Sequence, residues 1–296
     1  MHEPRVGSVS VMPLIRVMPR GWRTQARRTL RRLDDRAHGV CFADRLDEAD
    51  LAVVLVHHAS LLRRRLGETD PALQESKVVN LRLAIPAFDG LVIGPGETCS
   101  FWRRVGRPTA DRGYVAGLVL SRGAVSTGVG GGLCQLSNLL YWMALHTPLT
   151  VTERHHHSFD PFPDDRRVLP FGSGATVVWD LIDLRLRNET DQPFQLRVRL
   201  TDDHLQGAIH SDRPWPIAYH LVEREHRFVV EDDGVVRQNE LHRRLLDRRT
   251  GRLIAEELIG RNRARVTYMP AVAARAIDPA RPGPRHQGPR PPSAGG

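Results

Sequence analysis

Cys134 is the residue that the sequence places best for nucleophilic chemistry. It follows Leu133 and three successive glycines, Gly130–Gly132. Glycines let the backbone turn sharply and approach another segment closely. A cysteine in the first turn of the helix that follows would lie near free N–H groups and the positive end of the helix dipole, which predicts a lowered thiol pKa and a more nucleophilic sulfur. The alternative is a small buried cysteine beside glycines that only permit close packing.

The helix that begins near Cys134 is expected to have two different faces. The apolar stripe predicted to face the core consists of Leu133, Leu136, Leu140 and Met143. Ser137, Asn138 and Tyr141 stand three, four and seven residues after the cysteine, so they form a polar stripe on the thiol side. Hydrogen-bonding groups beside a reactive thiol are what a catalytic site needs.

Three successive histidines, His155–His157, follow Glu153 and Arg154. A neutral imidazole near Cys134 could act as a general base. A metal site is the second interpretation, with Cys134, His146 or Cys99 as further ligands, and surface histidines in a loop are the third. Residues on an extended segment alternate sides, so at most His155 and His157 could share a site. Because no paired-cysteine or spaced-histidine signature is present, we expect neither a metal nor a cofactor.

The elements that must position these residues indicate an α+β fold with N-terminal helices, a central glycine-rich loop and helix, and a C-terminal, mainly antiparallel β region. Helices are predicted over 21–38, 46–66 and 133–146, a helix or extended segment over 80–87, and strands over 91–93 and 115–121. Alternation of apolar and polar residues predicts strands at 177–181 and 194–200, and further strands at 217–230 and near Val235 and Leu253.

The composition is that of a basic globular protein. Of the 43 basic residues all but Lys77 are arginines, and the net charge is +9. Three cysteines are too few for a disulfide framework. The glycines lack the Gly-Lys-Ser/Thr of a phosphate loop, and the arginines alternate with acids rather than with aromatic residues, so no nucleic acid partner is expected. No secretory signal or membrane span is recognised, which predicts a cytoplasmic protein.

Residues 16–36 are rich in arginine, with apolar residues between them. One interpretation is a helix packed on the domain with a solvated face. The other is peripheral contact with an anionic membrane surface, at the inner face of the membrane. Residues 1–40 are therefore treated as an arginine-rich leader, 41–212 as the central domain, 213–270 as a β extension, and 271–296 as a disordered tail rich in proline and arginine.

Five strings between residues 75 and 212 resemble the signatures of the VanW family. They are Gly94–Trp102, Gly130–Asn138, Glu153–His157, Ala175–Val177 and Asp183–Thr190. The leader makes the chain similar to short members associated with B-type vancomycin resistance. The sequence departs from the family pattern at Gly174, where many members have aspartate, and at Cys99, where phenylalanine is usual.

This resemblance implies a role in glycopeptide resistance at the cell envelope. Some longer family members are L,D-transpeptidases that use the motif cysteine, which implies Cys134 as nucleophile and His157 as base on a cell-wall peptide or precursor. The residues that would then bind substrate or hold the oxyanion are Gly131, Gly132, Gln135, Ser137, Asn138 and Arg154. The alternative is a non-catalytic accessory or binding protein at the inner membrane face.

Overall fold

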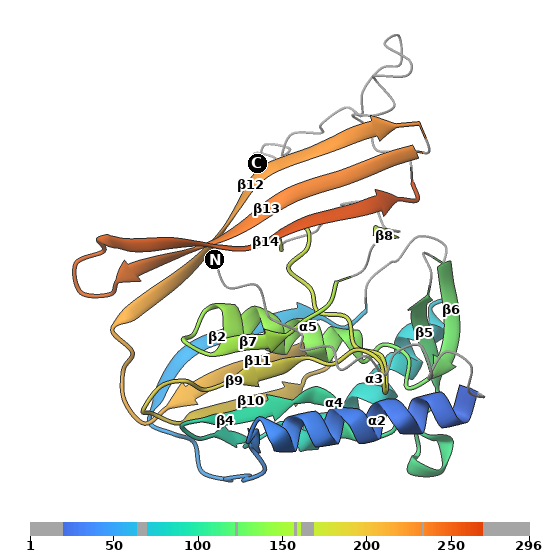
Figure 1. Ribbon diagram of the computed structural model, residues 1–296, viewed down its shortest axis with the longest axis horizontal. Coiled ribbons are helices and arrows are strands. Elements are labelled where there is room, and N and C mark those ends of the chain that lie inside the picture. The colour runs from blue at the N-terminus through green and yellow to red at the C-terminus, as the bar shows by residue number, and fades with distance from the viewer. Residues whose placement is uncertain are drawn as a thin grey trace, which may run out of the picture.

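The computed structural model describes residues 20–63, 70–121, 124–156, 159–160, 169–232 and 234–268. Its architecture is α+β, as the sequence predicted, with the long antiparallel strands toward the C-terminus (Figure 1). The predicted tail, 271–296, and residues 1–19 of the predicted leader lie outside the described residues.

Two four-stranded sheets make up the central part of the fold (Figure 1). The first has the order β1 (Cys41–Phe42), β4 (Glu97–Ser100), β9 (Arg185–Arg187) and β7 (Thr150–Glu153). The second has the order β2 (Val53–Leu61), β11 (His204–Ser211), β10 (Phe194–Leu200) and β3 (Val92–Ile93). A separate hairpin joins β5 (Ala116–Ser121) to β6 (Ala124–Val129).

The described residues form three longer helices, α2 (Arg20–Ala37), α3 (Ala72–Ala84) and α5 (Cys134–Leu145). The short helical segments are α4 (Phe101–Val105) and the 3₁₀ turns η1 (Ile85–Ala87) and η2 (Ala110–Arg112). The helices predicted over 21–38 and 133–146 are confirmed as α2 and α5, and the segment 80–87 ends α3 and continues as η1.

The helix predicted over 46–66 is wrong, because residues 53–61 form β2. This strand pairs antiparallel with β11, from His204 opposite Leu61 to Ser211 opposite Val53. Val53, Val54 and Val56 are β-branched residues, which lose side-chain freedom in a helix and pack well on a pleated sheet. The partner strand lies about 150 residues later in the chain, and local helix signals at the segment ends carry no information about it.

Helix α5 is the centre of the hydrophobic core and packs against β2, β11 and β7. The predicted apolar stripe, Leu133 to Met143, is confirmed as buried. Gly207 of β11 allows this close approach, because a Cβ there would lie 2.7 Å from Met143 Cε. The core therefore holds α5 rigidly along its length.

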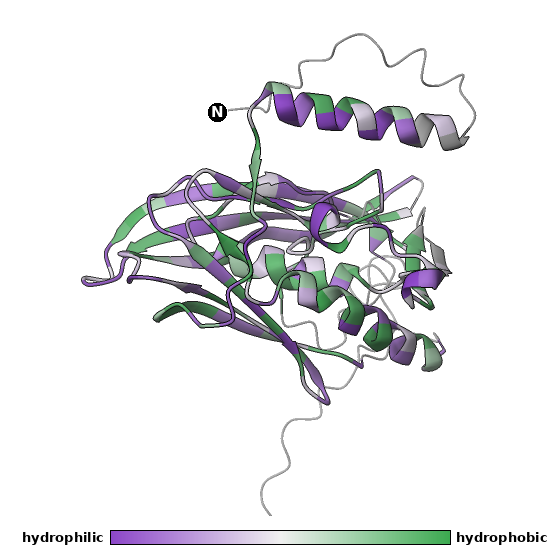
Figure 2. Ribbon diagram, turned by 90° about the horizontal axis from the view of Figure 1, so that it is seen from below, coloured by the Kyte–Doolittle hydropathy of each residue, from purple (hydrophilic) through white to green (hydrophobic). Residues whose placement is uncertain are grey.

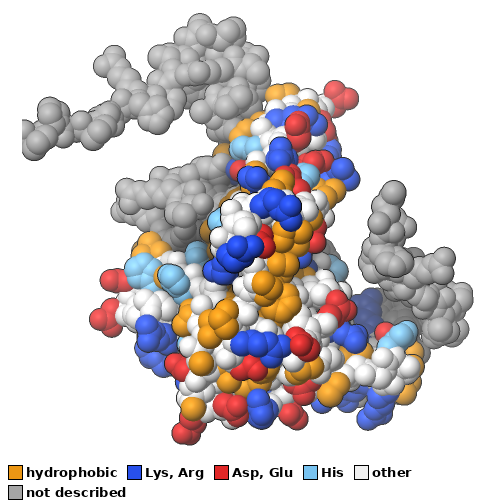
Figure 3. Space-filling model, turned by 90° about the vertical axis from the view of Figure 1, so that its left-hand side faces the viewer, with side chains coloured by type: hydrophobic (Ala, Val, Ile, Leu, Met, Phe, Trp, Pro, Cys, Tyr) orange, Lys and Arg blue, Asp and Glu red, His pale blue; other side chains and the backbone are white. Residues whose placement is uncertain are grey.

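The third sheet is built from β12 (Ile217–Glu231), β13 (Gly234–Asp247), β14 (Leu253–Val266) and the short β8 (Phe159–Asp160). Cross-strand ion pairs cover it, such as Arg224–Glu256 and Arg243–Glu257, both at 2.7 Å. Figure 3 shows basic and acidic side chains interspersed over one end of the molecule. The alternation of arginine with acid in the sequence thus provides ion pairs between strands: Arg243–Glu257 joins the neighbouring strands β13 and β14, and Arg224–Glu256 reaches from β12 across β13 to β14.

The strand expected at 177–181 is wrong. Val178 and Ile182 form an isolated bridge, and the Val178 carbonyl accepts the N–H groups of Leu181 and Ile182. Asp180 has a φ of 66°, in the left-handed region that a tight turn needs. The apolar–polar alternation of these residues belongs to a turn, because successive side chains point in different directions in a turn as they do in a strand.

Helix α2 lies along one face of the molecule, as the view in Figure 2 shows. Its side chains meet the body of the protein through charges, described below. Within the described residues, no helix is long and apolar enough to cross a membrane.

Candidate functional site

The glycine-rich turn before α5 is a site of very close backbone packing. A Cβ at Gly131 would lie 2.2 Å from the carbonyl carbon of Gly117 in β5. The carbonyl oxygen of Gly131 accepts a hydrogen bond from Asn80 Nδ2 at 2.9 Å, and Asn80 also bonds both backbone groups of Val115. Gly130, with a φ of 78°, rests on Pro108. These glycines are needed because two backbone segments touch here.

Gly132 packs against Lys77, the one lysine of the chain. A Cβ at Gly132 would lie 2.3 Å from Lys77 Cγ. The lysine is buried, and its Nζ donates to Gln74 Oε1 at 2.7 Å and to the Leu62 carbonyl. Lys77 therefore ties α3 to the end of β2 beneath the glycine turn. Sequence reasoning missed this role, although the uniqueness of the lysine was a signal.

Cys134 lies in the first turn of α5, as predicted, and is its first residue. Its environment, however, does not activate the thiol. The S–H group donates to the Val177 carbonyl, with a sulfur–oxygen distance of 3.8 Å. Burial raises the pKa of the Cys134 thiol above its ordinary value, because the charged thiolate loses its solvation. The expectation of a lowered pKa is wrong: desolvation raises the thiol pKa by more than the backbone hydrogen bonds at Val177 and Cys134 lower it.

The polar stripe of α5 is covered by residues 172–177, which we call the strap. Ser137 Oγ donates to the Ala175 carbonyl at 2.6 Å, and Asn138 Oδ1 accepts the Ala175 N–H at 2.7 Å. A Cβ at Gly174 would lie 2.9 Å from that Asn138 oxygen. The predicted stripe does lie on the thiol side, but its hydrogen bonds bind the backbone of this chain's own strap.

Arg154 holds the other half of the strap. Its Nε donates to the Gly174 carbonyl at 2.9 Å, and its Nη2 donates to the Gly172 carbonyl. The guanidinium lies 4.9 Å from the centre of the Tyr141 ring, a cation–π contact with α5. Burial lowers the pKa of Arg154 and raises that of Tyr141, because the charged form of each side chain loses solvation.

The opposite side of the strap meets the third sheet. Phe171 directly precedes the strap: Asn239 Nδ2 of β13 donates to its carbonyl at 2.7 Å, and Arg237 lies 4.6 Å from the centre of its ring. A Cβ at Gly172, where φ is 79°, would lie 2.1 Å from Asn262 Cγ of β14. The strap is therefore enclosed between α5 and the C-terminal sheet, and Ala175 and Val177 belong to the main core.

Gln135 points away from the strap. Its Nε2 donates to Ser60 Oγ at 2.8 Å and to the Leu61 carbonyl at 3.0 Å, both at the end of β2. The structure thus brings Cys134, Ser137, Asn138 and Arg154 together on the strap and directs Gln135 to a neighbouring strand. Gly131 and Gly132 lie behind them as packing residues.

The predicted base, His157, lies outside the described residues. His155 is described: its backbone bridges Thr176, and its Nε2 lies 3.9 Å from Glu153 Oε1. Across the described ranges, no three His, Cys, Asp or Glu side chains are grouped as a metal would require. The remaining candidate thiol, Cys99, is buried, and burial raises the pKa of Cys99 to about 12.

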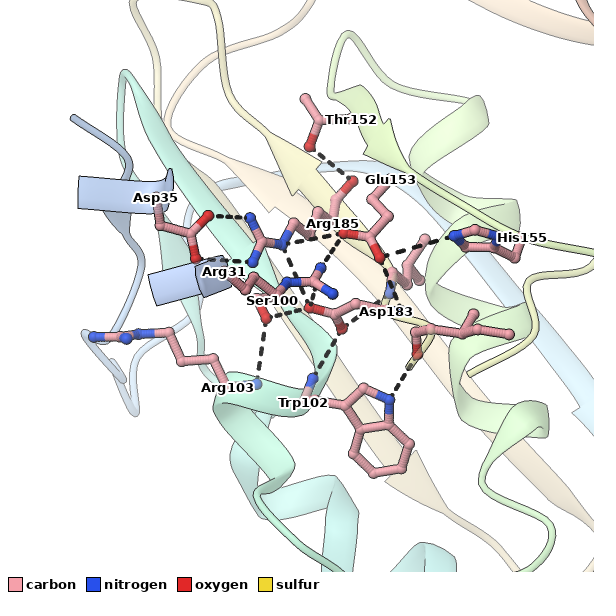
Figure 4. Close-up of polar contacts among 12 residues, drawn as sticks. Arg31, Asp35, Ser100, Trp102, Arg103, Thr152, Glu153, His155, Asp183 and Arg185 are labelled. Carbon is pink, nitrogen blue, oxygen red and sulfur yellow. Dashed lines mark hydrogen bonds and ion pairs between the residues drawn. The ribbon is translucent and has the colours of Figure 1, made fainter. Parts of the chain in front are cut away.

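A cluster of charges around Asp183 was not predicted, although its residues belong to the recognised strings (Figure 4). The buried Asp183 carboxylate accepts bonds from Ser100 Oγ at 2.6 Å and from the backbone N–H groups of Trp102 and Leu184, both at 3.0 Å. Arg185 Nε lies 3.4 Å from Glu153 and 3.5 Å from Asp183. The signal that could have predicted this cluster was that Glu153, Asp183 and Arg185 are charged residues within the strings that carry the family resemblance.

This cluster receives α2. Arg31 donates to Glu153 and lies 3.6 Å from Asp183, while Asp35 accepts two hydrogen bonds from Arg185, at 2.5 and 3.0 Å. The Arg185 pKa is raised by its bond to Asp35 and by the nearby acids, which outweigh the burial that lowers it. The acidic and basic groups are thus paired across the contact and hold the helix against the first sheet.

Comparison with known proteins places these features in a family. The model of the VanW like protein family matches residues 76–210. The chain is similar to the vancomycin B-type resistance protein VanW of Enterococcus faecalis (strain ATCC 700802 / V583), with 35% identity over 79% of this chain and 85% of that protein. It is also similar to the uncharacterized protein YoaR of Bacillus subtilis (strain 168), with 34% identity over 42% of this chain and 40% of YoaR. No solved structure matches.

Proposed function

This chain belongs to the VanW-like protein family, and from that premise we propose that it is a non-catalytic accessory protein of vancomycin resistance in which the Cys134 region is a structural clamp. The link to resistance is supported by the name of the Enterococcus faecalis relative. The observation that carries the non-catalytic role is the hydrogen bond from Cys134 to the Val177 carbonyl beneath the strap.

A cysteine nucleophile reacts as the thiolate. Burial raises the pKa of the Cys134 thiol above its ordinary value, which disfavours the thiolate. Among the described residues, the hydrogen-bond partner of the sulfur is a backbone carbonyl, and no histidine is bonded to it. These features support a thiol that is used for packing.

The groups that would bind a substrate are also engaged. Ser137, Asn138 and Arg154 direct four hydrogen bonds to the strap backbone, and a peptide substrate would need the same groups. Removing the strap would expose the core residues Ala175 and Val177 and leave buried polar groups without partners, which costs about 1–3 kcal/mol for each group. These contacts therefore support a structural role, in which Ser137, Asn138 and Arg154 clamp the strap to α5.

The second candidate function is cysteine-dependent acyl transfer on a cell-wall peptide. It is favoured by the position of Cys134 at the start of α5, directly after the glycine turn. The thiolate would attack a peptide carbonyl, the amine would leave with a proton from His157, and an acceptor amine would then displace the thiol from the thioester. This reaction needs the strap to move away first.

The deciding experiment incubates the full chain with muropeptides and follows the protein and the peptides by mass spectrometry, with a known L,D-transpeptidase as positive control. We expect no thioester adduct and no new cross-link. An adduct on the wild type that is absent from Cys134→Ala would establish the enzyme and refute the accessory role.

A cellular arm tests the accessory role directly. In a host where the chain raises the vancomycin concentration that inhibits growth, Cys134→Ala should retain the increase, because the substitution removes one partly buried sulfur atom and costs about 1 kcal/mol. A return to the vector level, with the protein still folded and equally abundant, would contradict the proposal.

A further inference from the structure

We propose that α2 attaches the protein to an anionic membrane surface, with Trp22, Leu30 and Leu33 entering the interface and the arginines beside them binding lipid headgroups. This goes beyond the proposed function and does not depend on the role of Cys134. It concerns a face of the helix that the described part of the chain leaves exposed.

The inward face of α2 is attached by charges. Arg28, Arg31 and Asp35 are spaced at three and four residues, so they lie on one side of the helix. Arg28 donates to Asp180 and stacks 4.8 Å from the centre of the Trp179 ring, while Arg31 and Asp35 enter the cluster around Asp183 (Figure 4). An amphipathic helix on a globular domain usually buries its apolar side, and this helix buries its polar side instead.

The outward face carries the apolar residues. Trp22, Leu30 and Leu33 are 73%, 41% and 53% exposed. At 100° per residue their mean direction is almost opposite that of Arg28, Arg31 and Asp35. Exposing a tryptophan and two leucines on one helix stripe has no benefit for a helix that contacts only water.

The positive charge of α2 beside the apolar stripe formed by Trp22, Leu30 and Leu33 favours an anionic membrane surface as the partner. Arg27, Arg32 and Arg36 are exposed, and Asp34 is the exposed acid among residues 25–36 of the helix. Each basic residue close to an anionic leaflet contributes about 1 kcal/mol of attraction. A tryptophan at the level of the headgroups and basic side chains around an apolar stripe are the features of helices that lie in a membrane interface.

The stripe is too small for a stable contact between two copies of this chain. Three partly exposed side chains offer roughly a few hundred Å² of apolar surface, whereas a stable protein interface buries about 800 Å² on each partner. A lipid surface needs no shape complementarity and combines this apolar area with charge.

The test measures binding of the full chain to sedimented vesicles of phosphatidylglycerol mixed with phosphatidylcholine, and to vesicles of phosphatidylcholine alone. We expect binding that needs phosphatidylglycerol and weakens in high salt. The variant Trp22→Gln/Leu30→Gln/Leu33→Gln should bind about tenfold more weakly or less, and Arg27→Gln/Arg32→Gln/Arg36→Gln should lose most of the dependence on salt.

A matched control removes three exposed apolar residues elsewhere. Leu253, Ile254 and Leu258 of β14 are exposed to a similar degree, and their triple change to glutamine should leave vesicle binding intact. Because the substituted residues of α2 are exposed, the α2 variants should keep the wild-type melting temperature.

Quenching by brominated phosphatidylcholine tests insertion itself. The other four tryptophans are at least partly buried, so vesicle-dependent quenching should vanish in Trp22→Phe. The proposal is overturned by wild-type protein that binds neither vesicle, by equal binding of the α2 apolar variant, or by light scattering that shows a dimer which that variant dissociates.

Discussion

The sulfur of Cys134 and the carbonyl oxygen of Val177 lie 3.8 Å apart, in hydrogen-bond contact across the end of α5. This contact joins two of the strings that carry the family resemblance. It shows that the strap residues lie on the helix of the motif cysteine. The polar residues around the thiol, which were expected to bind a substrate, hold the strap.

The first prediction concerns the reactivity of Cys134. Because burial raises the pKa of its thiol, alkylation of the native protein by iodoacetamide should be slow at pH 7 and should still be rising above pH 9. Peptide mapping separates Cys134 from the exposed Cys41, which serves as the internal control. A plateau of the Cys134 rate below pH 7 would mean an activated thiol.

Asn138→Ala should loosen the strap. The substitution removes the acceptor of the buried Ala175 N–H, which should lower the free energy of unfolding by about 1–3 kcal/mol and raise the alkylation rate of Cys134. Urea unfolding and timed alkylation measure the two effects.

The matched variant for this test is Gln135→Ala on the neighbouring residue, whose bonds go to Ser60 and Leu61 instead. It should leave the Cys134 rate close to that of the wild type. Equal acceleration in both variants would argue against a strap held by Asn138.

Gly131→Ala should be severely destabilising. Its new Cβ would overlap the backbone of Gly117, at 2.2 Å, and backbone cannot move aside as a side-chain tip does. We expect a loss of more than about 3 kcal/mol, measured by thermal or urea unfolding. Gly260→Ala, where a Cβ would meet nothing within 4 Å, is the control and should change stability by less than about 0.5 kcal/mol. Full stability of Gly131→Ala would contradict the packing described here.

Acid should destabilise the region around Trp142. The His58 ring lies 5.8 Å and the His146 ring 4.7 Å from the Trp142 ring. Burial lowers the pKa of both histidines, and their mutual repulsion lowers that of His58 further; His220 and Arg243 act in the same direction on His146. In the folded protein both rings therefore resist protonation.

The sign of the pH effect follows from that lowering. The unfolded chain takes up protons near the ordinary pKa of 6.5, so the contribution to stability is complete above pH 6.5 and is lost as the pH falls toward the lowered folded values. The melting temperature should drop between about pH 6.5 and 5, and less so in His58→Gln/His146→Gln. An identical drop in that variant would assign the acid sensitivity to other groups.

The sequence by itself determined the elements whose signals are local. The helix after the glycine turn, its apolar stripe from Leu133 to Met143, and the strand Phe194–Leu200 follow from periodicity, since a helix or strand with one buried face must repeat at its own period. The next strand, His204–Ser211, was not predicted. The family also follows, because its strings lie within short stretches of chain.

What only the tertiary structure decided are properties that arise between distant segments. Val53–Leu61 became a strand because β11 pairs with it, although its ends carry helix signals. From the helix dipole alone, the pKa of the Cys134 thiol was predicted to be lowered. In the fold, the strap about 40 residues later contacts the sulfur, and burial raises the thiol pKa instead. Likewise, the arginines of α2 could be read from the sequence, but their partners could not. Glu153 and Arg185 meet α2 only in the fold, and their ion pairs place the polar side of the helix inward and its apolar side outward.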